Sequence, residues 1–202
     1  MQSKGAPTIE QRTAYDLKDG RVDCWLGLIK QYGPASGQVI EIGCGHAVLL
    51  RELHNQGYSC LGVEISEDVS DWVSRQTGLQ VIAGAYPQIE LPECDLFLAF
   101  DVIEHVHDPV SFLRKTYDLL KPGGVAILQQ PVVRPEQGYS LEPPLGVDFE
   151  RMFDDLEHLW IFTNASFRVL AELSGLRILD ETSRWRQCHE IVILKKPEKS
   201  NG

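Results

Sequence analysis

The sequence predicts an α/β fold in which a parallel sheet carries helices on both faces. Apolar, strand-like runs alternate with amphipathic helical stretches from about residue 38 to about residue 128, and this alternation is typical of βαβ units. The run 96–100, which reads Leu-Phe-Leu-Ala-Phe, shows no polar alternation, as expected of a central strand buried on both sides. Apolar residues make up 43% and charged residues 24%, as in ordinary globular proteins.

The strands are predicted from short apolar runs. The expected strands are 38–42, 59–65, 79–83, 95–100, 125–130, 176–180 and 190–194. Helices are expected between them, because Ser66 and the pair Asp108-Pro109 suit helix N-termini. The glycines that suit helix ends are Gly33, Gly57, Gly78 and Gly175, the last of which closes a helix expected over 164–174.

Composition excludes several function classes. The net charge is −10 and no basic run of five residues exists, which disfavours a nucleic-acid partner. No apolar run approaches the roughly 20 residues needed to span a bilayer, and the first eight residues lack a secretion-signal pattern, so a cytoplasmic location is expected. The five cysteines are scattered without metal or redox spacing, which indicates reduced thiols.

The strongest functional signal is a Gly-rich turn between the first strand and an apolar helix over 48–53. Gly43 and Gly45 have no Cβ to obstruct a ligand that approaches the backbone, and the helix N-terminus offers unpaired N–H groups. Glu64 ends the second strand about 20 residues later, where a carboxylate can accept both ribose hydroxyls. A dinucleotide fold would want Gly or Ala where Val48 stands. The order of these signals therefore predicts a nucleoside cofactor other than NAD.

Four segments together resemble the class I methyltransferases that depend on S-adenosylmethionine (SAM), and within them the small ubiquinone-biosynthesis-like group. The segments read VIEIGCGHAVLLREL, LGVEIS, FDVIEHVHDPVSFLRKTYDLLKPGGVAILQQP and HLWIFTNASFRVLAELSGL. The resemblance implies a Rossmann-like, seven-stranded, mostly parallel sheet with helices on both faces and an antiparallel last strand. It also implies methyl transfer from SAM, with S-adenosylhomocysteine as the product.

A single domain over 1–202 is expected from the chain length. The resemblance divides it into an N-terminal helical cap (8–33), a cofactor-binding core (37–130), a substrate-side loop (131–160) and a C-terminal helix with a strand pair (161–195). The part of the loop over 131–157 is long for a compact domain, and such loops are usually functional or disordered.

The resemblance also gives roles to matched residues. Glu41 would face the methionine end of SAM, Glu64 would hold the ribose and Ile65 would pack on the adenine. The residues expected to bind the cofactor are Glu41, Gly43, Cys44, Gly45, His46, Glu64, Ile65, Gly84, Ala85, Tyr86, Asp101, Val102 and His105.

This chain departs from the family pattern at two places. Ala47 stands where the family usually has a third glycine in the first turn. The third strand is followed by Gly84-Ala85-Tyr86, whereas the family usually has an acidic residue there that contacts the adenine amino group. Adenine recognition is then expected to rest on backbone groups or on Tyr86.

Two histidines are candidates for a base that removes a proton from a hydroxyl acceptor. His105 follows the fourth strand, and His158 stands between the long loop and the last helix. A packing role is the alternative for each of them. A metal-dependent mechanism is disfavoured, because no two histidines have the spacing of metal ligands together with a carboxylate on the same face of an element.

Substrate contacts are predicted outside the core. Tyr15 is a candidate residue of a lid over the cofactor. In the long loop, Arg134 could bind a carboxylate or phosphate and Tyr139 could line a pocket. The alternative for the two loop residues is plain solvation. The leading hypothesis is methyl transfer to an oxygen or nitrogen of a small molecule. The alternative is a catalytically inactive, SAM-binding regulatory or partner subunit.

Overall fold

The computed structural model describes residues 11, 18, 20–132, 158–182 and 189–198. Its centre is a seven-stranded sheet of order β3-β2-β1-β4-β5-β7-β6. The strands are β1 (Gln38–Ile42), β2 (Ser59–Glu64), β3 (Gln80–Ala83), β4 (Cys94–Phe100), β5 (Leu120–Pro131), β6 (Arg177–Thr182) and β7 (His189–Lys195). Tyr15, Arg134 and Tyr139 lie outside the described residues.

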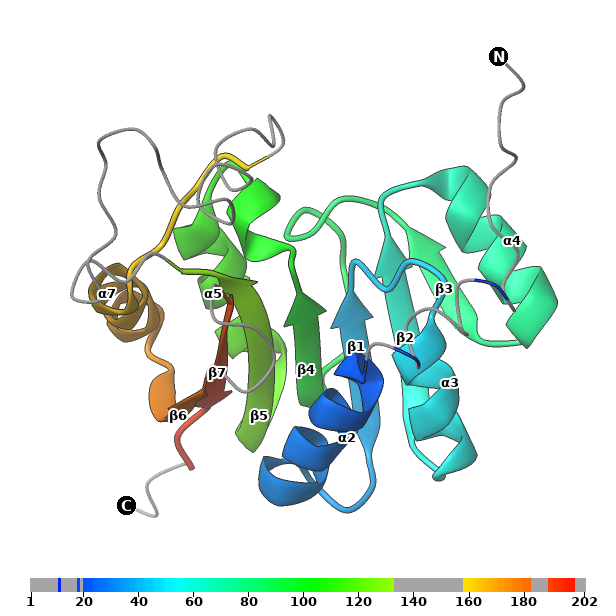
Figure 1. Ribbon diagram of the computed structural model, residues 1–202, viewed down its shortest axis with the longest axis horizontal. Coiled ribbons are helices and arrows are strands. Elements are labelled where there is room, and N and C mark those ends of the chain that lie inside the picture. The colour runs from blue at the N-terminus through cyan, green and yellow to red at the C-terminus, as the bar shows by residue number, and fades with distance from the viewer. Residues whose placement is uncertain (1–10, 12–17, 19, 133–157, 183–188, 199–202) are drawn as a thin grey trace.

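The sheet is parallel except at one strand. β1 to β5 pair in parallel, and β7 pairs antiparallel with both β5 and β6. The predicted fold class is therefore confirmed, including the antiparallel last strand. Because the parallel strands end at one edge, the loops after β1, β2 and β4 gather there (Figure 1).

Helices cover both faces of the sheet (Figure 1). One core layer packs α2 (Arg21–Tyr32), α3 (Val48–Asn55) and α4 (Glu67–Thr77) on the sheet. The other packs α5 (Pro109–Leu119) and α7 (Asn164–Ser174) on the opposite face. A short 3-10 turn, η1 (Ile103–His105), follows β4. None of the described helices is both long and apolar enough to cross a membrane.

Local capping chemistry sets the helix ends as predicted. The Ser66 side chain accepts a hydrogen bond from the Val69 N–H at the start of α4, and Asp108 accepts one from Ser111 at the start of α5. Gly78 and Gly175 end α4 and α7 in left-handed conformations. These ends could be predicted because each depends on residues only a few positions apart.

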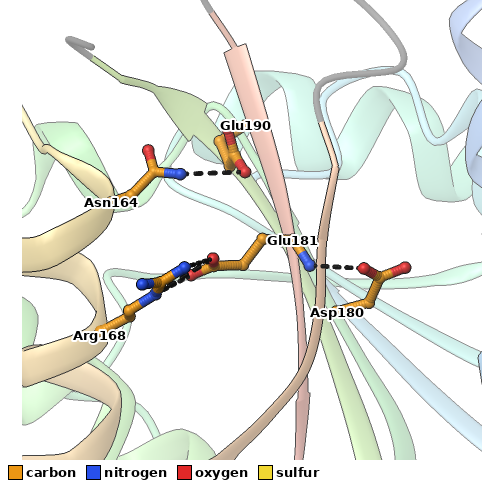
Figure 2. Close-up of polar contacts among 5 residues, drawn as sticks. All are labelled: Asn164, Arg168, Asp180, Glu181 and Glu190. Carbon is orange, nitrogen blue, oxygen red and sulfur yellow. Dashed lines mark hydrogen bonds and ion pairs between the residues drawn. The ribbon is translucent and has the colours of Figure 1, made fainter. Parts of the chain in front are cut away.

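The last helix is fastened to the antiparallel strand pair by polar contacts (Figure 2). The Arg168 guanidinium donates to both carboxylate oxygens of Glu181 on β6, and Asn164 Nδ2 donates to Glu190 Oε1 on β7 at 3.4 Å. Phe162, just before α7, packs edge to face on Phe167 of the helix, with ring centroids 5.6 Å apart. The start of α7 is thus held in place, and with it the segment 158–163 that leads into the helix.

Candidate functional site

Two cavities adjoin at the edge where the parallel strands end. The larger, of about 410 Å³, is lined by Ile42, Gly43, Val63, Glu64, Ile65, Gly84, Ala85, Tyr86, Asp101, Val102, His105 and Val106. The smaller, of about 130 Å³, is lined by Arg21, Val22, Trp25, Glu41, Gly43, Cys44, Gly45, His46, Val48, Leu49, Phe100 and Asp101. Gly43 and Asp101 line both. The cofactor residues predicted from the sequence all lie on one or the other.

The Gly-rich turn after β1 separates the two cavities. The N–H groups of Gly43 and Cys44 both donate to the Val63 carbonyl, at 2.8 and 3.1 Å. Gly43 and Gly45 have left-handed φ angles of +69° and +49°. A Cβ at Gly43 would lie 2.7 Å from Val102 Cγ2, whereas a Cβ at Gly45 would meet nothing within 4 Å. A side chain at Gly43 would therefore displace the Val102 side chain, whereas a side chain at Gly45 would enter open space.

Ala47 also has a left-handed backbone, with φ +53°. This conformation costs a residue with a Cβ roughly 1–2 kcal/mol, which explains physically why a glycine suits this position. The methyl group is fully buried against the sheet, so it still contributes packing. The departure at Ala47 is therefore compatible with the turn.

Glu64 connects the turn to the end of β2. Its Oε2 accepts from the Gly45 N–H and its Oε1 from the Ser66 N–H, both at 3.1 Å. A carboxylate oxygen has two lone-pair sites, so each oxygen can still accept a hydroxyl from a ligand in the larger cavity. The two backbone donors fix the direction in which those remaining sites point.

Glu41 is a buried acid on the wall of the smaller cavity. Its side chain is 6% exposed, and burial raises the pKa of its carboxyl to about 8. Oε2 has no hydrogen-bond partner among the described residues. A cationic ligand group beside this oxygen would satisfy it and favour the ionised carboxylate.

Asp101 stands at the junction of the cavities, just after β4. Its φ is +55°, and its N–H donates to the Gln129 carbonyl at 2.9 Å. Gln129 Nε2 donates to both carboxylate oxygens at 3.0 Å. Gln129 on the neighbouring strand β5 therefore holds both the backbone and the carboxylate of Asp101.

Apolar and backbone groups form the rest of the larger cavity. Ile65 is 77% exposed, which is unusual for its type and leaves an apolar surface for a flat ring. The Gly84 N–H donates to the Glu64 carbonyl at 3.0 Å. The Tyr86 hydroxyl lies 3.0 Å from Thr116 Oγ1, and its ring packs on Phe112. The hydroxyl of Tyr86 is thus engaged in the core while the residue lines the cavity.

Cys44 and His46 line the smaller cavity through the turn. Burial raises the pKa of the Cys44 thiol, which keeps it protonated and unreactive. His46 makes an edge contact with Trp72 at 5.5 Å between ring centroids. Cys24, Cys44, Cys60 and Cys94 are free thiols, as predicted.

His105 and His158 lie side by side, although they are far apart in the sequence. Their ring centroids are 4.8 Å apart. The Glu104 carbonyl accepts hydrogen bonds from the Leu159 and Trp160 N–H groups, at 2.8 and 3.1 Å, and these bonds hold the segment 158–163 against η1. His105 lines the larger cavity and its side chain is 33% exposed. The two candidate bases therefore share one location beside the cavity.

Glu104 adds a carboxylate to this pair. Its side chain is fully buried, and the ligand atoms of Glu104, His105 and His158 all lie within 4.8 Å of one another. Two imidazoles and a carboxylate are a donor set that could hold a divalent metal. The same set is equally suited to a histidine base that a carboxylate orients. No spacing in the sequence predicts this cluster, because His158 comes from another element than Glu104 and His105.

Sequence reasoning missed the role of two residues near Asp101. Trp25 is buried like an ordinary core aromatic, yet its Nε1 donates to Gln129 Oε1 at 3.0 Å. Gln129 itself was not singled out. The available signal was the pair of glutamines at the end of the apolar strand predicted over 125–130, since amides that become buried require partners.

A family profile described as "Methyltransferase domain" matches residues 11–181. The curated protein ubiquinone biosynthesis O-methyltransferase from Ruegeria pomeroyi is 34% identical over 115 residues, which cover 54% of this chain and 46% of that protein. Its counterpart from Pseudomonas aeruginosa is 31% identical over 128 residues, 59% of this chain and 53% of that protein. The chain thus spans about half the length of these curated relatives.

Solved structures share the fold at low identity. An S-adenosylmethionine-dependent methyltransferase from Mesorhizobium loti has a TM-score of 0.68 at 17% identity, with 88% of this chain and 99% of that chain covered. Human N-acetylserotonin methyltransferase, solved in complex with SAM, has a TM-score of 0.70 at 16% identity, with 94% and 55% covered.

The raised pKa of Glu41 predicts a pH-dependent stability. The native state holds a proton that the unfolded chain releases above pH 4.5. The stabilisation of the native state that this proton provides is therefore full below pH 4.5 and is lost as the pH rises toward about 8. Glu41→Gln cannot ionise. Its free energy of unfolding relative to wild type should therefore increase between these pH values, as measured by chemical denaturation.

Glu172→Gln, which removes an exposed carboxylate on α7, is the matched control. A difference between Glu41→Gln and wild type that stays constant across the pH range would contradict the assignment of a buried proton to Glu41.

Proposed function

We propose that this chain, which belongs to the methyltransferase domain family, transfers the methyl group of SAM to an oxygen or nitrogen atom of a small molecule. The family and the fold confirm SAM as the cofactor predicted from the sequence. The curated relatives are named as O-methyltransferases, which favours oxygen as the acceptor atom.

The observation that carries the proposal is the carboxylate of Glu64 anchored on the Gly-rich turn. Two backbone N–H groups orient it toward the larger cavity, where it would accept the ribose hydroxyls of SAM. Ile65 would pack on the adenine, and the backbone of Gly84 and Ala85 would border the ring. Adenosine would thus occupy the larger cavity.

The methionine half of SAM would occupy the smaller cavity. Its ammonium would lie beside the buried Glu41 carboxyl, which would then ionise. Arg21, whose guanidinium lies 5.9 Å from the Trp25 ring centroid, lines the same cavity and would pair with the methionine carboxylate. Asp101, at the junction of the cavities, would lie near the cationic sulfonium.

Methyl transfer is an in-line displacement at the methyl carbon, so aligning donor and acceptor is the main task of the protein. SAM would supply the methyl carbon, whose bond to the sulfonium sulfur would break as the bond to the acceptor atom forms, with S-adenosylhomocysteine, an uncharged thioether at sulfur, as the product. A hydroxyl acceptor also loses a proton. His105 or His158 would take it at an imidazole nitrogen.

The partners proposed for the chain follow from its charge. A net charge of −10 disfavours a polyanionic acceptor such as nucleic acid, and the acceptor that we propose is a small molecule. Tyr15, Arg134 and Tyr139 stay sequence-based predictions for its binding. The alternative, a SAM-binding subunit without activity, is disfavoured by the candidate bases beside the larger cavity.

Transfer of label tests the proposed activity. Incubation of the protein with methyl-labelled SAM and a metabolite extract should give a labelled small molecule together with S-adenosylhomocysteine, identified by mass spectrometry. Binding of SAM without any labelled product from extracts of several organisms would instead support the inactive subunit.

Glu64→Ala should weaken SAM binding by about 1–3 kcal/mol, because hydroxyl donors of the ribose would lose their acceptor. Calorimetric titration measures the change. Glu67→Ala, three residues further on at the exposed start of α4, is the control and should bind SAM as wild type does. Wild-type affinity in Glu64→Ala would remove the ribose assignment.

His105→Ala and His158→Ala separate a base from a packing residue. Loss of the base should lower turnover by a factor of about 10² to 10⁴ while SAM affinity changes little, whereas loss of a packing histidine should mainly lower the melting temperature.

The same assay with and without a chelator tests the metal alternative at Glu104, His105 and His158. Turnover that survives chelation in wild type and falls in one histidine variant identifies the base. Near wild-type turnover in both variants would mean that neither histidine is the base.

A further inference from the structure

The Gln129 side chain makes an unusually complete set of contacts for a buried amide. It is 1% exposed and lies on the face of the sheet that α2 covers. Its Oε1 accepts from Trp25 Nε1 at 3.0 Å, and its Nε2 donates to Asp101 Oδ1 and Oδ2, both at 3.0 Å. One amide thus links the first described helix to the junction of the two cavities.

The chemistry of the partners permits only one orientation of this amide. The indole N–H of Trp25 is a donor only, so the amide oxygen must face it. Both Asp101 carboxylate oxygens act as acceptors, so the amide nitrogen must face them. The reversed amide would place donor against donor and oxygen against oxygen. The indole therefore determines which amide group Asp101 meets.

Gln129 holds Asp101 through the backbone as well. Its carbonyl accepts from the Asp101 N–H at 2.9 Å, at a residue whose left-handed φ of +55° is uncommon outside glycine. Because the backbone and the carboxylate of Asp101 are both bonded to Gln129, the turn after β4 is fixed where Asp101 lines both cavities.

The position of Trp25 is fixed in addition by Phe100, the neighbour of Asp101. Its ring stacks on Phe100, with centroids 4.1 Å apart and planes inclined by 19°, and it lines the smaller cavity. The position of α2 is therefore transmitted through Trp25 and Gln129 to the Asp101 carboxylate.

We propose that Gln129 is a positioning residue for the methionine half of SAM, and that it acts by holding the Asp101 carboxylate in an orientation set by Trp25. This inference rests on the proposed place of Asp101 beside the sulfonium. It gives α2 a function beyond covering the sheet, because the indole of this helix orients Asp101, just after β4, through one amide.

The next residue on β5 provides a matched control. The Gln130 side chain is fully buried, but neither of its amide atoms has a hydrogen-bond partner among the described residues. It is the same residue type on the same strand, and its side chain points to the opposite face. Replacement of Gln130 removes a buried amide without touching Asp101.

The test compares the affinities of SAM and of adenosine, which lacks the methionine half, for four proteins. Gln129→Met removes the donor to Asp101 and should weaken SAM about ten- to a hundredfold, the effect of losing hydrogen bonds to a charged group. Adenosine should stay within about twofold of wild type. Trp25→Phe keeps the stacked ring without its N–H and should weaken SAM in the same direction. Gln130→Met should change neither affinity.

The ratio of the two affinities separates positioning from stability, because partial unfolding weakens both ligands equally. Equal weakening of SAM and adenosine by Gln129→Met and Trp25→Phe, or unchanged SAM affinity in both, would overturn the inference. A protein that binds SAM with this pattern of variants but produces no labelled methyl product would contradict the proposed activity and leave the role of Gln129 standing.

Discussion

The site depends on a single constraint, which is that the chain must reverse direction after β1 while leaving its backbone open to a ligand. The Val63 carbonyl receives two N–H groups from the turn, and the Glu64 carboxylate receives a third from Gly45. β2 therefore holds the turn that follows β1. Because the Glu64 carboxylate that would bind the ribose also accepts a hydrogen bond from the turn, one side chain contributes both to the shape of the cavity and to its chemistry.

Electrostatics then determines what the site can hold. Glu41, Glu64 and Asp101 place three carboxyl groups around two adjoining cavities. Burial raises the pKa of Glu41, so its carboxyl tends to hold a proton, which lowers the negative charge around the cavities. A cofactor that carries an ammonium and a sulfonium replaces that proton by a fixed cation. The charge pattern thus suits SAM better than it suits an anionic nucleotide.

Polar contacts at the end of the chain position the histidines. The pairing of Arg168 with Glu181 and of Asn164 with Glu190 fastens α7 to the antiparallel strands, and the Glu104 carbonyl holds the segment that precedes it. His158 comes to His105 by this route. A substitution in β6 or β7 would therefore alter the position of the histidines beside the larger cavity, although no polar residue of this strand pair lines that cavity.

The sequence by itself determined the α/β class, the strand order along the chain, the helix ends and the two signals for a nucleoside, because each depends on periodicity or on residues a few positions apart. Ser66, Gly175 and the Gly43–Gly45 turn are of this kind. The tertiary structure alone decided which glycine faces open space, since only the position of Val102 distinguishes Gly43 from Gly45. It alone paired His105 with His158 and joined Trp25 to Asp101 through Gln129, because contacts between distant segments follow from how the elements pack, and a single sequence does not record them.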